Sequence, residues 1–339
     1  MKPKETIIEA SNIYFGGGFI LLKLLVDKLE AQKNYTIVFL KYKDVLRAFS
    51  EGDYRYVSFI RTTSSGTLFR YFLRRNKILF FCNLPPFRKQ QRSLLYFHNP
   101  HFSKRPVINL RSVLTPGKLK HYLYYHWIKF FAKNVDIVGC QTSAIMEDLQ
   151  QTGIQAVQLP FFGIVKPGNE DVRYDFCYVS TAAPHKNHKI LFEAVKILAT
   201  SIDFNIAVTI NHCEANNELL QTIDDINKEL GKDVIINAGR LERNDVIDLY
   251  CQSRALVFPS LTETFGLPLI EALQCNLTIL ASDKPFTHNV VENAIVFDPA
   301  DPYSIADQMK GFLEGRFESI KQKILVDNKI DEIIKLLNN

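Results

Sequence analysis

The chain has 339 residues, of which 47% are hydrophobic and 23% are charged, so its composition excludes a disordered or fibrous protein and its length fits two globular domains. No apolar run reaches the roughly 18 residues of a membrane-spanning helix, and no apolar segment follows the N-terminal Met-Lys-Pro-Lys-Glu as it would in a secretory signal peptide. The six cysteines show no metal-type spacing, which indicates free thiols in a reducing cytoplasm.

Charge is distributed unevenly along the chain. Residues 1–163 contain 24 Lys and Arg against 10 Asp and Glu, whereas residues 164–339 contain 17 against 26. Between Tyr54 and Val135 there are 16 basic residues and no acidic one, with many aromatic residues among them. This basic region 54–135 indicates an anionic partner, either a membrane surface or a soluble acceptor. A basic surface that only aids solubility, over a core of aromatic residues, is the structural alternative.

Short apolar strands alternate with amphipathic helices through the first half of the chain. Strands are predicted at residues 6–10, 35–40, 56–60, 77–82, 94–97, 135–140 and 155–159, and helices after Gly18, at 68–75, at 116–132 and from Thr142 to about Gly153. Residues 160–170 contain Pro160, Gly163, Pro167 and Gly168, which predicts a linker.

The first strand leads into a glycine loop, Gly16-Gly17-Gly18, and then a helix. Such a loop lets the backbone approach a ligand closely, although it is not the GxGxxG fingerprint of dinucleotide-binding proteins. A flexible turn is the alternative. His98 follows the strand at 94–97, and ligands of open α/β sheets bind at the carboxyl ends of strands, so His98 is a candidate site residue. A solvated loop histidine is the alternative.

The second half continues the alternation, which predicts an α/β protein. Strands are expected at residues 176–181, 204–210, 234–237, 255–258, 276–281 and 294–297, and helices at 189–199, 214–230, 244–251, 303–312 and 317–337. Lys186 opens a helix after the first of these strands, where an ammonium group can meet a phosphate. A solvated first-turn lysine is the alternative.

The most informative stretch is residues 257–273. Gly266 and Pro268 mark a turn from a strand into a helix, with Glu263 on the loop and Glu271 one turn into the helix. Amide groups around residues 265–267 and the helix dipole favour an anion beside the two carboxylates. A ligand with both hydroxyls and phosphates, such as a nucleotide sugar, fits this arrangement. An ordinary strand, turn and helix with two solvated acids is the alternative.

This stretch resembles the acid–seven–acid signature of retaining glycosyltransferases of family four, which have the GT-B fold. The resemblance rests on Pro259-Ser260, the acids Glu263 and Glu271, Phe265-Gly266-Leu267-Pro268 between them, and Ala272 at the end. Thr264 stands where the family usually has Gly. Lys186-Asn187 resembles the family's second marker, but Ser180-Thr181 replaces the usual Gly-Arg, so part of the diphosphate charge must be met elsewhere.

The resemblance implies two doubly wound Rossmann-like domains facing across a cleft. The expected parts are an N-terminal acceptor-side domain at residues 1–162, a nucleotide-sugar-binding domain at 163–315, and a C-terminal helix at 316–339 that crosses back to the first domain. The implied activity is retaining transfer of a sugar from a UDP or GDP sugar to a glycan or lipid-linked acceptor, in synthesis of a bacterial surface polysaccharide such as lipopolysaccharide or capsule.

The resemblance also assigns roles to residues. Glu263 is expected to hold donor sugar hydroxyls and stabilise positive charge, Lys186 to neutralise the diphosphate, and His98 to meet the donor sugar or acceptor. The expected donor-binding residues, with Glu271 on the ribose and the Arg240 loop at the base, are Gly17, Gly18, Arg240, Leu241, Thr264, Phe265, Gly266, Leu267 and Glu271. No metal and no cofactor are expected, because the second half has no tight Asp-x-Asp pair.

Other functions stay open on the sequence alone. They are a sugar-nucleotide epimerase or phosphorylase, a nucleic-acid-binding module, which the glutamate signature disfavours, and an inactive relative that only binds nucleotide. The expected location is cytoplasmic, peripheral on the inner face of the membrane. The basic residues expected to contact that face are Arg70, Arg74, Arg75, Lys118 and Lys120.

Overall fold

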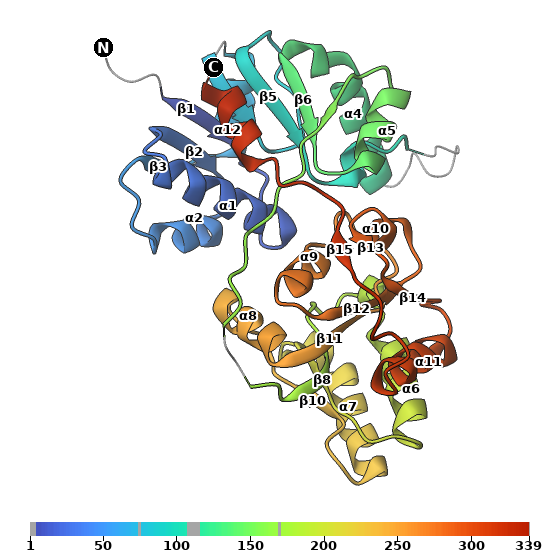
Figure 1. Cartoon of the computed structure of the whole chain (residues 1–339). Helices are drawn as coiled ribbons and strands as arrows, with labels where there is room; N and C mark the ends of the chain where they lie inside the picture. Colours follow the sequence, from blue (N-terminus) through green and yellow to red (C-terminus); the bar gives the residue numbers. More distant parts are fainter. Residues whose placement is uncertain (1–4, 74–75, 107–115, 169–170, 339) are drawn as a thin grey trace. The chain divides into compact units, whose positions relative to one another are not determined.

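The computed structural model of the protein describes residues 5–73, 76–106, 116–168 and 171–338. The chain divides into two compact units, unit 1 (Met1–Gly163 and Asp327–Asn339) and unit 2 (Ile164–Val326). Each unit has its own parallel sheet with helices on it (Figure 1). The predicted α/β class with two doubly wound sheets is therefore confirmed.

The sheet of unit 1 has seven parallel strands in the described residues, in the order β3-β2-β1-β4-β5-β6-β7. The central strands are apolar and buried on both faces, as in β5, where residues 93–97 are all buried. The strands are β1 (Thr6–Glu9), β2 (Thr36–Leu40), β3 (Val57–Arg61), β4 (Asn76–Phe80), β5 (Gln91–Phe97), β6 (Ile137–Cys140) and β7 (Val157–Gln158).

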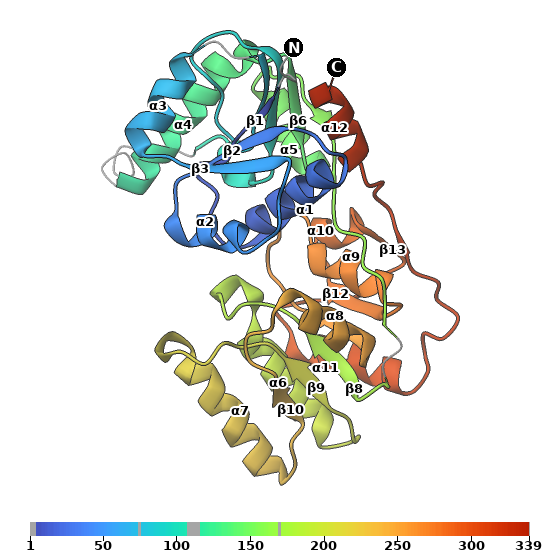
Figure 2. The same ribbon diagram turned by 90° about the vertical axis from the view of Figure 1, so that its left-hand side faces the viewer.

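Helices cover both faces of this sheet (Figure 2). On one face, Tyr71, Ile128 and Ile145 from three helices join one apolar core with side chains of β4, β5 and β6; these helices are α3 (Ser64–Phe72), α4 (Pro116–Phe131) and α5 (Ser143–Gln151). The other face carries α1 (Gly17–Ala31), α2 (Lys43–Ser50) and α12 (Ile330–Asn338), and Lys28 of α1 pairs with Asp331 of α12 at 2.9 Å.

Unit 2 has a six-stranded parallel sheet in the order β10-β9-β8-β11-β12-β14. The strands are β8 (Tyr174–Tyr178), β9 (Ile206–Val208), β10 (Ile235–Asn237), β11 (Ser253–Phe258), β12 (Thr278–Ser282) and β14 (Ile295–Phe297). The helices are α6 (His188–Ala199), α7 (Asn217–Leu230), α8 (Arg243–Cys251), α9 (Leu267–Gln274), α10 (Pro285–His288) and α11 (Pro302–Leu313).

The two sheets repeat one strand order. Within each unit the first strand lies at the centre, two later strands add on one side, and the chain then returns to add strands on the other side. The order therefore reverses between β1 and β4 in unit 1 and between β8 and β11 in unit 2. In open α/β sheets, ligands bind beyond the carboxyl ends of the strands at such a switch point.

The helix predicted at residues 317–337 is wrong in its extent. Lys323–Ile324 form β15, which pairs antiparallel with β13 (Val291–Glu292), and the Gln322 side chain bonds both the amide (2.7 Å) and the carbonyl (3.0 Å) of Ile279. The helix α12 begins only at Ile330, whose amide donates to Asn328 Oδ1 at 3.3 Å. Helical spacing was present earlier in the segment, but these tertiary hydrogen bonds outweigh it. The helix packs against β4 and β5 of unit 1.

Candidate active site

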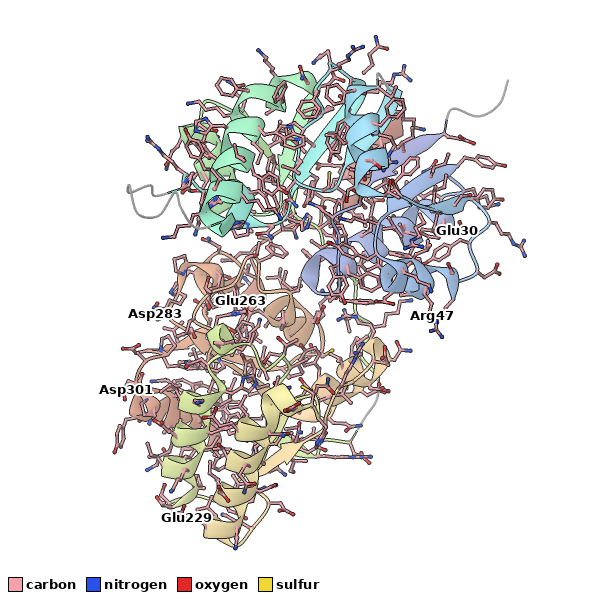
Figure 3. All side chains as sticks on the ribbon, turned by 180° about the vertical axis from the view of Figure 1, so that it is seen from behind. Glu30, Arg47, Glu229, Glu263, Asp283 and Asp301 are labelled. Carbon is pink, nitrogen blue, oxygen red and sulfur yellow. The ribbon has the colours of Figure 1, made fainter. Side chains whose placement is uncertain are left out.

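The loops that leave the two switch-point strands of unit 2 carry the predicted phosphate lysine and the first signature glutamate. Lys186 follows β8, and Glu263 lies on the loop between β11 and α9 (Figure 3). Lys186 Nζ donates to Glu263 Oε1 in a salt bridge, and both side chains are largely buried, at 14% and 13% exposure. The ammonium also lies 5.6 Å from the centre of the Phe258 ring. A buried cation and a buried carboxylate therefore face each other where this fold binds ligands.

Hydrogen bonds between the two loops hold this pair in place. The Leu261 amide donates to the His185 carbonyl at 2.8 Å, and Asn187 Nδ2 donates to the Pro259 carbonyl at 3.2 Å. The Tyr178 hydroxyl, at the end of β8, donates to the Lys186 carbonyl at 2.7 Å. These bonds fix the backbone from which the Lys186 and Glu263 side chains extend, so the two groups start from defined positions.

The turn into α9 has the geometry that the sequence predicts. Gly266 caps the helix in the left-handed conformation, with a φ of 80°, and a Cβ there would also lie 3.0 Å from Leu269 Cδ1. Pro268 stands in the first turn, where its missing amide costs nothing. Phe265 is buried, whereas Thr264 and Leu267 are partly buried. The first-turn amides of α9 thus begin directly after the loop that carries Glu263.

Glu271, the second signature acid, is more buried than the first. Only 6% of the residue is exposed, and its carboxylate pairs with Arg243 at 2.7 Å. Burial raises the pKa of Glu271, and Arg243 opposes that rise by its charge and its hydrogen bond. Sequence reasoning missed Arg243. A signal was available, since a cation at the first residue of a helix is disfavoured by the helix dipole and needs a carboxylate partner.

The loop predicted at the nucleobase follows β10, the outermost strand of the unit 2 sheet. Gly239 adopts a φ of 71°, and its amide donates to Asn237 Oδ1 at 3.1 Å. Arg240 is exposed and Leu241 is partly buried. The loop lies at the same carboxyl edge of the sheet as Lys186 and Glu263.

In unit 1 the glycine loop and His98 come together. A Cβ on Gly18 would lie 2.9 Å from His98 Nε2, so glycine is needed for this close approach, while a Cβ on Gly17 would meet nothing within 4 Å. The imidazole stacks on Phe81 at 4.8 Å, and its Nδ1 is buried with no hydrogen-bond partner among the described residues. Burial lowers the pKa of His98 to about 4, so the ring is neutral at pH 7.

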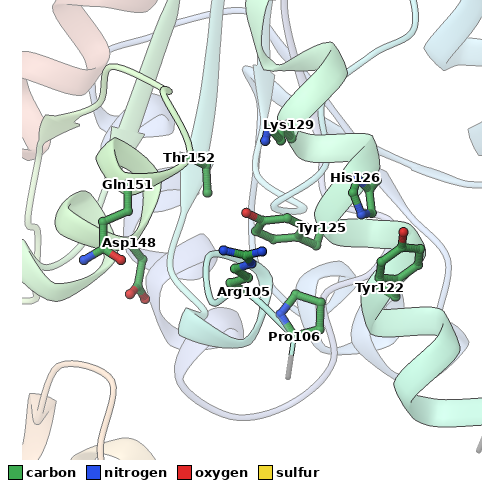
Figure 4. Close-up of a pocket in the computed structure, with 9 residues that line it drawn as sticks. All are labelled: Arg105, Pro106, Tyr122, Tyr125, His126, Lys129, Asp148, Gln151 and Thr152. Atoms are coloured by element: carbon green, nitrogen blue, oxygen red, sulfur yellow. The ribbon is translucent and has the colours of Figure 1, made fainter. Parts of the chain in front are cut away.

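A pocket of about 800 Å³ opens elsewhere in unit 1 (Figure 4). It lies beside α4 and the C-terminal half of α5, which runs back from the carboxyl edge of the sheet, so it is separate from His98. Ser103 Oγ donates to its one carboxylate, Asp148, at 3.0 Å. Within the described residues, no carboxylate pairs with Arg105 or Lys129. The lining residues are Arg105, Pro106, Tyr122, Tyr125, His126, Lys129, Asp148, Gln151 and Thr152.

Two further properties bear on cofactors and membranes. Among the described residues, no group of three or more His, Cys, Asp or Glu side chains is arranged to hold a metal ion. None of the helices in the described part of the chain combines the length and the apolar character needed to span a bilayer.

The two doubly wound sheets, with a buried lysine–glutamate pair at the switch point of the second, define a protein of the GT-B class. Solved structures share this fold: HepE of Anabaena, in complex with UDP and glucose, aligns with a TM-score of 0.65 and 14% identity over 93% of this chain and 91% of its own. Sucrose-phosphate synthase of Thermosynechococcus elongatus aligns with the same TM-score and identity over 92% and 90%.

The family described as glycosyl transferases group 1 matches residues 164–330, nearly all of which lie in unit 2, and the resemblance is therefore confirmed. The O-antigen chain mannosyltransferase RfbU of Salmonella typhimurium is 32% identical over 136 residues, which are 40% of this chain and 37% of that protein. The serotype-specific mannosyltransferase WbdA of Escherichia coli is 29% identical over 43% of this chain and 18% of its own length. The alignments therefore span about a third or less of these relatives.

Proposed function

We propose that this protein is a retaining glycosyltransferase that moves a sugar from a nucleotide-diphosphate sugar to a glycan or lipid-linked acceptor in synthesis of a bacterial surface polysaccharide. The observation that carries the proposal is the buried Lys186–Glu263 pair at the switch point of unit 2. The names of the relatives favour a mannosyl residue and an O-antigen product. Because HepE, which shares the fold, was solved with UDP, UDP-sugars are tested as donors together with GDP-sugars.

When the donor binds, Lys186 and Glu263 each give up their mutual salt bridge and bind the donor instead. The ammonium of Lys186 turns from Glu263 to the diphosphate, and the first-turn amides of α9 add donors to the same anion. Glu263, released from Lys186, accepts hydrogen bonds from the donor sugar hydroxyls and stabilises the positive charge that develops on the anomeric carbon. Negative charge grows on the leaving diphosphate at the same moment, and Lys186 stands where that charge appears. Glu271 accepts hydrogen bonds from the ribose hydroxyls.

The His98 imidazole contributes a neutral hydrogen-bonding group from unit 1. Its pKa of about 4 excludes an imidazolium at pH 7, so it acts as a hydrogen-bond donor or acceptor toward the sugar or the acceptor hydroxyl. The Gly18 backbone lies close beside the ring, where a larger residue would meet Nε2.

The surface of α4 in unit 1, the expected acceptor-side unit, supports the proposal that the protein binds at an anionic membrane surface. Leu119, Leu123 and Phe130 are spaced to share one face of α4, and they are 42%, 58% and 60% exposed. Exposed lysines, Lys118, Lys120 and Lys129, flank this apolar stripe, which is the pattern of a helix that lies in a bilayer interface. Arg105 and Lys129 of the neighbouring pocket offer cations to a phosphate of a lipid-linked acceptor.

The prediction that Arg70 contacts the membrane face is wrong. Arg70 does not face solvent: its side chain is 14% exposed, and its Nε donates to the buried carboxylate of Glu9 at 2.7 Å. The guanidinium also lies 4.0 Å from the centre of the Phe39 ring, so Arg70 serves the core of unit 1. Arg74 and Arg75 lie outside the described residues.

A donor screen tests the proposed function directly. The protein is incubated with UDP- and GDP-linked hexoses, mannose among them, and release of the nucleoside diphosphate is followed with and without lipid-linked acceptor. Transfer with the anomeric configuration of the donor kept, read by NMR of the product, is expected. Inversion of that configuration contradicts retention, and an altered free nucleotide sugar instead of a transfer product identifies an epimerase. Nucleotide binding without any turnover identifies an inactive relative.

A further inference from the structure

The carboxylate of Glu271 has an environment in which a lone charge is unstable. It lies in α9 with 7% of its side chain exposed, and burial works against its ionised form. The titratable groups that face it are the phenol of Tyr250 in α8, the thiol of Cys275 directly after α9 and Arg243 at the start of α8. Among the described residues, Arg243 is the only cation in an ion pair with it.

The guanidinium of Arg243 is in turn placed by this carboxylate. Arg243 is the first residue of α8, where the helix dipole disfavours a positive charge, and its side chain is 41% exposed. Glu271 is the one carboxylate that pairs with it in the described residues. The guanidinium contacts Oε1 at 2.7 Å, and a carboxylate offers about four lone-pair sites, so sites remain for further donors.

We propose that Arg243 is a positioning residue for nucleotide binding: it holds the Glu271 carboxylate in its charged, accepting form, aimed at the two hydroxyls of the nucleotide ribose. The inference rests on the proposed function, which assigns Glu271 to the ribose, and it adds a residue from a different helix to that subsite. A charged carboxylate accepts two O–H donors at once. A protonated one must donate a hydrogen bond itself and loses this match to a diol.

The role predicts a defined dependence on pH. Without Arg243, burial remains and the opposing charge is gone, so the pKa of Glu271 rises further above its usual range. The ionised form, and with it ribose binding, is present above the folded-state pKa and is lost as the pH falls through that value. Removal of Arg243 therefore moves this loss from acidic pH toward neutral pH.

The experiment measures the affinity of UDP and GDP, and of uridine and guanosine, by calorimetry from pH 5.5 to 9 for the wild-type protein, Arg243→Gln and Arg243→Lys. We expect Arg243→Gln to bind all four ligands more weakly at pH 6.5 than at pH 9, with the affinity falling by up to about tenfold for each pH unit below the pKa of Glu271, because the ionised fraction falls by that factor. The deficit shrinks toward pH 9, and Arg243→Lys restores most of the affinity at pH 7.

Two comparisons separate this role from others. The loss in Arg243→Gln is equal for the nucleoside and the nucleoside diphosphate, because both carry the ribose, and it disappears for 2′,3′-dideoxynucleotides, which lack the diol. Arg254→Gln is the matched control, since Arg254 pairs with Asp175 at the same distance of 2.7 Å but at the start of β11, on the opposite edge of the sheet. It is expected to leave nucleotide affinity unchanged at every pH.

Several results overturn the inference. A loss that is independent of pH, that persists with dideoxynucleotides, or that is larger for the diphosphate than for the nucleoside shows that Arg243 does not act through Glu271 on the ribose. If Arg243→Gln fails to fold, the series is run with Arg243→Met, and wild-type affinity for every ligand together with an unchanged pH profile in that variant contradicts the inference. Failure of the proposed function is distinct, because the wild-type protein itself then binds no nucleotide.

Discussion

Unit 1 and unit 2 share one strand order and differ in what stands at the switch point. In unit 2 the loops after β8 and β11 place a buried ammonium against a buried carboxylate. In unit 1 the loop after β1 places a glycine against a neutral imidazole, and α4 carries exposed lysines. The cores fix the common scaffold, whereas side chains on loops and outer helix faces do not enter those cores and are free to carry different chemistry.

If the charge pair of unit 2 is the reacting centre, removal of its carboxylate has the largest effect. Glu263→Gln is expected to lower turnover by about 10²–10³-fold, or about 2.7–4 kcal/mol in the barrier, because a charge aimed at the transition state is lost. The matched control is Glu218→Gln, whose carboxylate pairs with the exposed Lys189. Steady-state kinetics with the accepted donor provide the measurement, and near wild-type turnover in Glu263→Gln removes this residue from the centre.

The two units are expected to respond to acid through different histidines. Burial lowers the pKa of both His98 in unit 1 and His188 in unit 2 to about 4. The unfolded chain, with an ordinary histidine pKa of about 6.5, takes up protons first, so folding stability falls as the pH drops from about 6.5 to 4. At pH 4.5 each histidine accounts for about 2–3 kcal/mol of that loss.

Fluorescence of Trp127, the single tryptophan of the chain, reports on unit 1. Urea unfolding followed by this signal is expected to lose most of its dependence on pH between 6.5 and 4.5 in His98→Gln and to keep it in His188→Gln, while His101, whose pKa is also lowered, contributes the remainder. An equal response of both variants shows that the units unfold as one, and no change in His98→Gln contradicts the neutral, buried state of this histidine.

The lysine of the pair sharpens the comparison, because its role concerns phosphate alone. Lys186→Met is expected to weaken nucleoside diphosphate binding by about 1.5–3 kcal/mol, the size of a charge-assisted hydrogen bond, and to leave nucleoside binding nearly unchanged. The control is Lys189→Met, which lies three residues further along and pairs with an exposed carboxylate. Calorimetry gives both affinities. Equal weakening of nucleoside and diphosphate places Lys186 outside the phosphate site.

The smallest effects per residue are expected on the outer face of unit 1. Lys118→Ser and Lys120→Ser each remove about 1 kcal/mol of binding to anionic vesicles, and high salt removes the remainder of the electrostatic attraction. Lys41→Ser and Lys43→Ser, two exposed lysines with the same spacing beside α2, form the control. Co-sedimentation measures the partitioning. Equal binding to neutral and anionic vesicles, or no binding to either, contradicts docking through α4.

The sequence by itself determined the α/β class, most element positions and the turn at residues 257–273. These features depend on local patterns: apolar strands buried on both faces, helical spacing, and the glycine and proline that the turn before α9 requires. It also determined Lys186, Glu263 and Glu271 as candidates, because residue type and spacing alone resemble a known signature. The final helix was overextended, since its spacing continued where hydrogen bonds to β13 and Ile279 form instead.

Only the tertiary structure decided which of these residues meet and which charges are exposed. Lys186 and Glu263 are 77 positions apart, and the parallel order of β8 and β11 brings their loops together. Arg243 reaches Glu271 from another helix, and Arg70 turns inward to Glu9 rather than outward. The physical reason is that a side chain's partner is set by the packing of elements distant in the chain, and no periodicity in one segment contains that information.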